Sequence, residues 1–266
     1  MIRMLLTLGV LLALHAGCSN KKAEPRVATK ESSKVEKADP QPKEAPITDE
    51  RAQQALEVMA DPQSKTDQGP GLAAMLLVDA WLKQGPDEAA RQRTSKALER
   101  VIALGSPFMR TRAYGLLADY ALPDAERILI AEVENPSRDE HGAAGVALGQ
   151  VIKDFAQIRD WIRDDQPFHW EAALSMMSTF KTFDKTEQEQ RWSERRTLLI
   201  ELGKRPDLPA SVVYGLAEWF ELYLDEDPSD AQILQLAERW SKHPDDMAAQ
   251  QMKKAVYMAR INRETR

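Results

Sequence analysis

Cysteine and histidine are the residue types in this chain best suited to act as nucleophiles, general bases or metal ligands, and both are scarce. Cys18 is the only cysteine and ends an apolar run near the N-terminus. His141, His169 and His243 are far apart in the sequence and do not form a His-Glu-x-x-His zinc motif. A single cysteine also excludes an intramolecular disulfide and an all-thiolate zinc site. We therefore expect neither a metal nor another cofactor.

The spacings typical of common catalytic sites are also missing from the sequence. It contains neither a Gly-x-x-x-x-Gly-Lys phosphate-binding loop nor a Gly-x-Ser-x-Gly nucleophile elbow. The sequence therefore predicts that the protein is not an enzyme. The alternative is an enzyme, or an enzyme accessory, whose site is spread over several helices, with His141 or His169 as the general base.

Residues 1–17 have the pattern of a secretory signal peptide. Arg3 precedes an apolar run from Met4 to Leu14, about half the ~20 residues that a membrane-spanning helix needs. The following Ala16-Gly17-Cys18 resembles the lipobox of bacterial lipoproteins, in which small residues precede a cysteine that is lipidated and becomes the mature N-terminus. An ordinary secretory signal with an incidental cysteine is the alternative.

The resemblance to lipoproteins implies a diacylglycerol and an N-acyl chain, such as palmitate, on Cys18. More than one chain is needed for stable anchoring, because a single acyl chain binds a membrane only marginally. Membership of this class implies a bacterial cell-envelope location. Since Ser19 is not the aspartate that favours inner-membrane retention in the family, we expect the periplasmic face of the outer membrane.

Residues 18–47 are expected to be the lipidated cysteine and a disordered tether. Ser19 to Ile47 contains seven basic residues, five acidic residues and four prolines, and it has no aromatic residue. A segment with so little apolar surface cannot offset the entropy lost on ordering. The tether carries a net charge of +2, so the remainder of the mature chain carries −9. This acidic body argues against nucleic-acid binding and favours a basic protein partner.

Residues 48–266 are expected to form one helical-repeat domain. Thr48 to Arg266 contains 29 alanines and 22 leucines but only nine valines and nine isoleucines, a balance that favours helix over strand. Six prolines occur at intervals of 29 to 42 residues, at or just before helical patterns: Pro70, Pro107, Pro136, Pro167, Pro209 and Pro244. These intervals match the length of a two-helix repeat.

The segment Gly142-Ala-Ala-Gly-Val-Ala-Leu-Gly149 resembles the first helix of HEAT repeats, and it follows a helix–turn–helix pattern in residues 106–135. The resemblance implies an all-α fold: a right-handed α-α superhelix, or solenoid, of about five to six HEAT-like repeats. Tetratricopeptide-like repeats are the structural alternative, because Asp227-Pro228-Ser229-Asp230 resembles that family. Either solenoid would offer one extended groove.

Two tryptophans are the candidate partner-binding residues. Trp161 and Trp170 lie on either side of the turn Asp164-Asp165-Gln166-Pro167, where an amphipathic ring could anchor another protein. The sequence thus predicts a lipid-anchored, non-enzymatic scaffold for protein–protein interaction. A purely structural part in envelope assembly, with the tether spacing two layers, is a further alternative.

Overall fold

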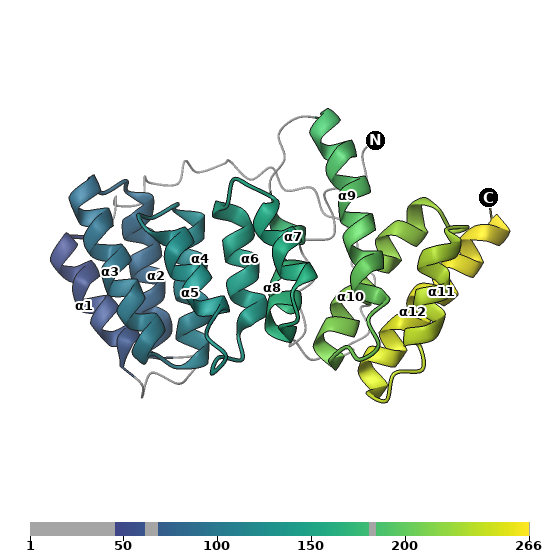
Figure 1. Ribbon diagram of the computed structural model, residues 1–266. Helices are drawn as coiled ribbons and strands as arrows, with labels where there is room; N and C mark the ends of the chain where they lie inside the picture. The colour runs from purple at the N-terminus through teal and green to yellow at the C-terminus, as the bar shows by residue number, and fades with distance from the viewer. Residues whose placement is uncertain (1–45, 62–68, 181–184, 266) are drawn as a thin grey trace, which may run out of the picture. The chain divides into compact units, whose positions relative to one another are not determined.

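The computed structural model describes residues 46–61, 69–180 and 185–265. The expected signal peptide, Cys18 and nearly all of the expected tether lie outside these residues. Within them the chain forms twelve α-helices and no strand (Figure 1), so the prediction of an all-α fold is confirmed. The helices are α1 Asp49–Ala60, α2 Pro70–Lys83, α3 Glu88–Leu104, α4 Pro107–Asp119, α5 Ala125–Val133, α6 His141–Val151, α7 Ala156–Arg163, α8 Pro167–Thr179, α9 Lys185–Gly203, α10 Ala210–Glu226, α11 Ala231–Trp240 and α12 Asp246–Thr265.

The prolines that were noted in the sequence precede or begin every even-numbered helix. Pro70, Pro107 and Pro167 are the first residues of α2, α4 and α8. Pro209 is the N-cap of α10, and the remaining two precede α6 and α12 by five and two residues. Proline suits these places because the first turn of a helix has no intrahelical partner for its N–H.

Polar side chains cap several helices at their N-termini. Ser106 accepts a hydrogen bond from the Met109 amide at 3.4 Å, and Asp87 accepts one from the Ala90 amide at 2.8 Å. Ser137 is not a helix cap, because α6 starts at His141. Ser137 instead bonds the side chain of Asn135 in the preceding turn.

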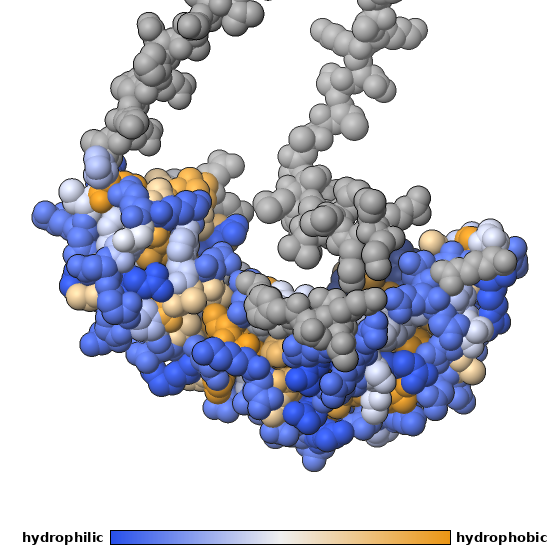
Figure 2. Space-filling view, turned by 90° about the horizontal axis from the view of Figure 1, so that it is seen from above, coloured by the Kyte–Doolittle hydropathy of each residue, from blue (hydrophilic) through white to orange (hydrophobic). Residues whose placement is uncertain are grey.

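The helices pack in two rows, which we call the even row and the odd row after their numbers. In the even row, α4 packs on α6, α6 on α8, α8 on α10 and α10 on α12. In the odd row, α1 packs on α3, α7 on α9 and α9 on α11. Consecutive helices such as α5 and α6 or α11 and α12 connect the rows. Figure 2 shows hydrophobic patches on this face and a largely hydrophilic outer edge.

The two rows differ in composition over the first eight helices. Helices α2, α4, α6 and α8 contain six Asp, Glu, Lys or Arg residues in total, whereas α1, α3, α5 and α7 contain sixteen. Helix α6 has none of these residue types. Because charged side chains resist complete burial, the even row is suited to close contact on more than one side and the odd row to solvent.

The closest helix contact lies between α6 and α8. A Cβ added to Gly145 would stand 2.8 Å from the Ala172 Cα, and one added to Gly149 would stand 2.6 Å from the Met176 carbonyl oxygen. Such separations are too short for any side chain, so glycine is what allows the two backbones to approach. Helix α6 ends at Val151, and Phe155 is the N-cap of α7.

Candidate functional site

The two candidate tryptophans lie in the protein interior at the junction of α7 and α8. Trp161 is 4% exposed and Trp170 is 6% exposed. The Trp170 indole N–H donates to the Asp164 carbonyl oxygen at 2.9 Å, and the Arg205 guanidinium lies 4.5 Å from the centre of one of its rings. In this arrangement the indoles hold the α7–α8 turn together and are not accessible from the surface, so their proposed role as partner anchors stays a prediction.

His169 completes this turn. Its Nδ1 atom is hydrogen-bonded to the Asp164 carboxylate, and its ring stacks on Trp161 with 4.9 Å between ring centres. The His169 Nε2 atom is buried without a hydrogen-bond partner among the described residues. An aspartate on Nδ1 fixes the imidazole orientation and leaves Nε2 as the atom that could accept a proton.

His141 lies on the other side of a shared aromatic neighbour. Its ring stacks on Phe168 with 5.1 Å between centres, and Phe168 contacts His169 edge-on at 4.5 Å. The His141 ring is 7% exposed, and its Nδ1 has no partner among the described residues. The structure therefore brings the two candidate histidines to one aromatic cluster. Within the described chain, no group of three or more His, Cys, Asp or Glu side chains could hold a metal.

A partly buried polar network joins α3, α4, α5 and the turn between α5 and α6. The Tyr114 hydroxyl donates to Glu132 at 3.1 Å, and the Arg138 Nε donates to the same carboxylate at 3.1 Å. Arg138 also reaches the Ile102 carbonyl oxygen at 3.2 Å. Burial, reinforced by Glu132, raises the pKa of Tyr114, so its hydroxyl keeps its proton and acts as a donor. These residues hydrogen-bond to one another, so we assign them a role in stabilising the fold.

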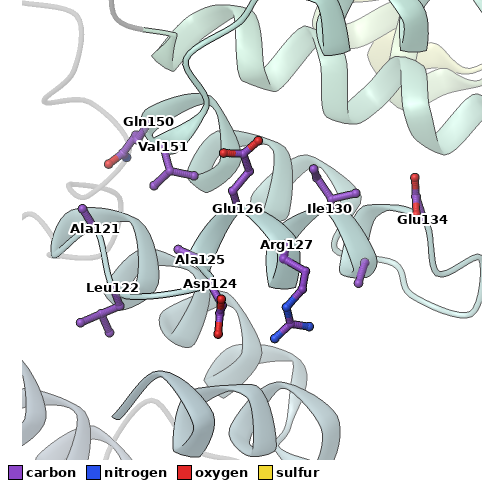
Figure 3. A pocket seen from close by; sticks show the side chains of 11 residues that line it. Ala121, Leu122, Asp124, Ala125, Glu126, Arg127, Ile130, Glu134, Gln150 and Val151 are labelled. Carbon is purple, nitrogen blue, oxygen red and sulfur yellow. The ribbon is translucent and has the colours of Figure 1, made fainter. Parts of the chain in front are cut away.

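An open groove with a volume of 840 Å³ lies beside α5 (Figure 3). Helix α5 packs on α4, α6 and α8 but has no extensive contact with α7, which leaves the odd row open at this point. The groove is lined by carboxylates and apolar side chains, among them Asp124, Glu126, Glu134, Ala125, Ile130 and Val151.

The charges in the groove are predominantly negative. Glu126 and Glu134 are exposed and have no ion-pair partner in the described part of the chain. The one lining cation, Arg127, donates to Glu99 of α3 at 3.2 Å. Figure 3 shows the Arg127 side chain directed away from Glu126, Gln150 and Val151. Its charge is therefore partly neutralised outside the groove, and the groove itself presents carboxylates to solvent.

One wall of the groove is the turn that joins α4 to α5, and α3 holds this turn in place. The Arg91 guanidinium donates to the carbonyl oxygens of Tyr120 and Ala121 at 2.8 and 3.0 Å. Gln92 donates to the Asp124 carboxylate at 3.3 Å. Ala121 and Asp124 have φ angles of 43° and 60°, the only positive values among described residues other than glycine.

The sequence did not single out this groove. The helix–turn–helix pattern over residues 106–135 was recognised, but none of its residues was proposed as a binding residue. The available indication was the spacing of Glu126, Ile130 and Glu134, which puts an apolar residue between two acids on one face of a helix. The sequence could not show that α5 and α7, neighbours in the odd row, have no extensive contact.

Comparison with known proteins adds no relative. No family model matches the sequence, no curated protein matches it, and no solved structure matches the fold. Among the described helices, none has the length and the apolar character required to cross a membrane.

Proposed function

We propose that this protein is a non-enzymatic, lipid-anchored scaffold of the bacterial cell envelope, whose HEAT-like solenoid of about five to six two-helix units binds another protein. Each unit would begin with an even-numbered helix and pair it with the next odd-numbered helix, as α4 with α5 and α6 with α7. The lipid on Cys18 and the tether behind it would keep this solenoid close to the outer membrane, at its periplasmic face.

One observation carries the solenoid part of the proposal: side chains repeatedly bond a backbone carbonyl one repeat length away. Five arginines do so, at separations of 29 to 43 residues: Arg91 to Tyr120, Arg138 to Ile102, Arg205 to Ile162, Arg239 to Arg205 and Arg263 to Pro228. In a solenoid each unit contacts mainly its neighbours, so inter-unit bonds recur at the repeat period. Prolines before every even-numbered helix give the same period.

The HEAT-like assignment is supported over the tetratricopeptide-like alternative by the α6–α8 contact. The sequence that resembles the first HEAT helix is α6, and its glycines allow the even row to pack closely. Small residues at this contact are what the resemblance implies. An experimental structure with a different stacking of the units would overturn this part of the proposal.

The anchoring part is tested with a Cys18→Ser variant expressed in a bacterial host. We expect the wild-type protein to incorporate a clickable palmitate analogue and to sediment with membranes. The variant is expected to lose both the label and the membrane association. A variant that remains fully membrane-bound would contradict lipid anchoring. Loss of binding to the partner protein, by itself, would not contradict it.

The binding part is tested by proximity crosslinking in intact cells. A scaffold should crosslink to the same envelope protein in repeated experiments. Deletion of residues 19–45 should reduce this crosslinking if the tether sets how far from the membrane the helical domain can bind. If deletion of these residues caused an envelope defect while crosslinking to the partner persisted, the purely structural role in envelope assembly would be favoured instead.

The second candidate function is an enzyme or enzyme accessory, and the Asp164–His169 pair is the observation that favours it. An aspartate-oriented imidazole with an unbonded Nε2 is an arrangement that a general base requires. Substitution of His141 and His169 by glutamine, in a protein that remains folded, tests it. An unaltered cellular phenotype would count against this function.

A further inference from the structure

We propose that the groove beside α5 is the docking site for a basic, amphipathic helix of the partner protein. This inference rests on the proposed scaffold function and names where and by what chemistry the partner binds. The occupant is defined by two features of the groove: the carboxylates of Glu126 and Glu134, which form no ion pair within the described residues, and a strip of apolar side chains that lines the same groove.

Charge complementarity specifies the polar side of the partner. Glu126 lies in the first turn of α5, and Glu134 is the C-cap of the same helix. They are eight residues apart, which corresponds to about 12 Å along the helix axis. Two lysines or arginines seven or eight residues apart on a partner helix would span the same distance. Asp124 adds a third carboxylate at the N-terminal end of α5. Cations at this spacing would bind more favourably than a single cation.

The apolar strip specifies the other side of the partner. Ile130 and Val151 are half-buried, Ala131 is exposed, and all three line the same groove as the acids. Apolar side chains placed one turn from the cations would therefore contact this strip, as in other complexes in which an amphipathic helix lies in a groove. A strongly charged peptide without apolar residues would leave the strip in contact with water.

The groove is held in shape before any partner arrives. Arg91 fixes the wall at Tyr120 and Ala121, and Gln92 fixes it at Asp124. A preformed wall lowers the ordering cost of binding. The groove is also open to solvent and 840 Å³ in volume. It therefore suits one side of a helix better than a small molecule, which binds most tightly in an enclosed cavity.

The test uses three synthetic peptides of equal length and the intact folded protein. The first is an amphipathic helix of leucine and lysine with lysines seven residues apart, the second has the same composition in scrambled order, and the third replaces lysine by glutamate. Fluorescence anisotropy at near-physiological salt measures the dissociation constants. We expect the first peptide to bind at least tenfold more tightly than the scrambled peptide, and the glutamate peptide not to bind.

Two variants with the same net charge locate the site. Glu126→Gln/Glu134→Gln removes the free groove carboxylates, and Glu50→Gln/Asp207→Asn removes two exposed acids that do not line the groove. We expect about a tenfold weaker affinity for the first variant and less than a twofold change for the second. Ala131→Trp fills the groove without changing any charge and is expected to weaken binding similarly.

Equal losses in the two charge variants would show non-specific attraction to an acidic protein and would overturn the proposal. Equal binding of the ordered and scrambled peptides, or unchanged binding by Ala131→Trp, would also overturn it. In each of these cases the scaffold function could still hold through another surface. That function is tested separately, by repeated partner capture in cells with the Glu126→Gln/Glu134→Gln variant.

Discussion

The α6–α8 contact and the open side of α5 both adjoin α6, yet they are built in opposite ways. Between α6 and α8, glycines bring two backbones together and leave no room for a side chain. Beside α5, acidic side chains border a groove that no helix of the described chain fills. Small residues therefore allow close packing in the even row, whereas the lack of an extensive α5–α7 contact leaves a groove in the odd row. Because the two features depend on different residues, mutations should change stability and binding separately.

The largest expected effect is on the closed side. Gly145→Ala would place a Cβ within 2.8 Å of the Ala172 Cα, so the helices must separate. We expect a loss of about 3 kcal/mol in the free energy of unfolding, at the upper end of overpacking costs. Urea denaturation followed by circular dichroism measures it, and unchanged stability would show that the two helices do not pack as described.

Gly115→Ala is the matched control within another even-numbered helix. Gly115 lies inside α4, and an added Cβ would meet nothing within 4 Å. Since glycine is a poor helix former, we expect this change to stabilise the protein by about 0.5–1 kcal/mol. Changes of opposite sign in the free energy of unfolding for the two Gly→Ala substitutions would show that close backbone contact, not helix propensity, requires glycine at position 145.

The network between the rows should give an intermediate effect. Tyr114→Phe removes the hydroxyl that donates to Glu132 and leaves that partly buried carboxylate with one donor fewer. We expect a loss of about 1–2 kcal/mol, as for other unsatisfied buried groups. Thermal unfolding measures it. Tyr257→Phe is the control, because Tyr257 is 63% exposed and has no hydrogen bond among those described.

An acid-dependent effect is expected at the α9–α11 contact in the odd row. Burial alone would raise the pKa of Asp230, but the hydrogen bonds and charge of Arg196, together with the backbone amides of Ile233 and Gln232, outweigh it, so this pKa lies below its usual value of 3.8. A lowered pKa in the folded state stabilises the protein above the unfolded value, and this contribution is lost as the pH falls through the folded value.

Asp230→Asn therefore should flatten the loss of stability below about pH 4. Asparagine also caps helices well, so the cap of α11 is retained while the charge is removed. Urea midpoints from pH 2 to pH 7 measure the slope. A variant with the same acid dependence as the wild-type protein would contradict this role of the Arg196–Asp230 pair.

The smallest effect on stability is expected on the open side. Glu126→Gln/Glu134→Gln changes exposed side chains without an ion pair in the described chain, so the free energy of unfolding should shift by less than about 0.5 kcal/mol. Thermal denaturation checks this. A much larger shift would mean that the groove carboxylates hold the fold together and are not free to bind.

The helical composition and the six prolines were sufficient to predict an all-α fold and the starts of four even-numbered helices, from Pro70, Pro107, Pro167 and Pro209. Local rules govern both features, because helix propensity and the missing proline N–H act within one turn. The start of α6 was less predictable, since Ser137 and the acids after it look like a cap but instead belong to a turn.

The groove and the α7–α8 turn could not be predicted for a different reason. The Arg91–Tyr120 bond joins residues 29 positions apart, and the absence of a helix contact beside α5 has no counterpart in the local sequence. Likewise, Trp161 and Trp170 stand next to a polar turn in the sequence, but both are buried in the structure. Trp161 stacks on the His169 ring, and Trp170 donates to the backbone carbonyl of Asp164. Burial of this kind depends on packing between units.

The most direct test of the scaffold account places a photo-crosslinking amino acid in intact cells at Ala131, in the groove, and at Glu50, away from it. We expect one envelope protein to crosslink at Ala131, through a basic segment identified by mass spectrometry, and not at Glu50. This crosslink should weaken in the Glu126→Gln/Glu134→Gln background. Equal crosslinking at both positions, or an acidic crosslinked segment, would contradict the account.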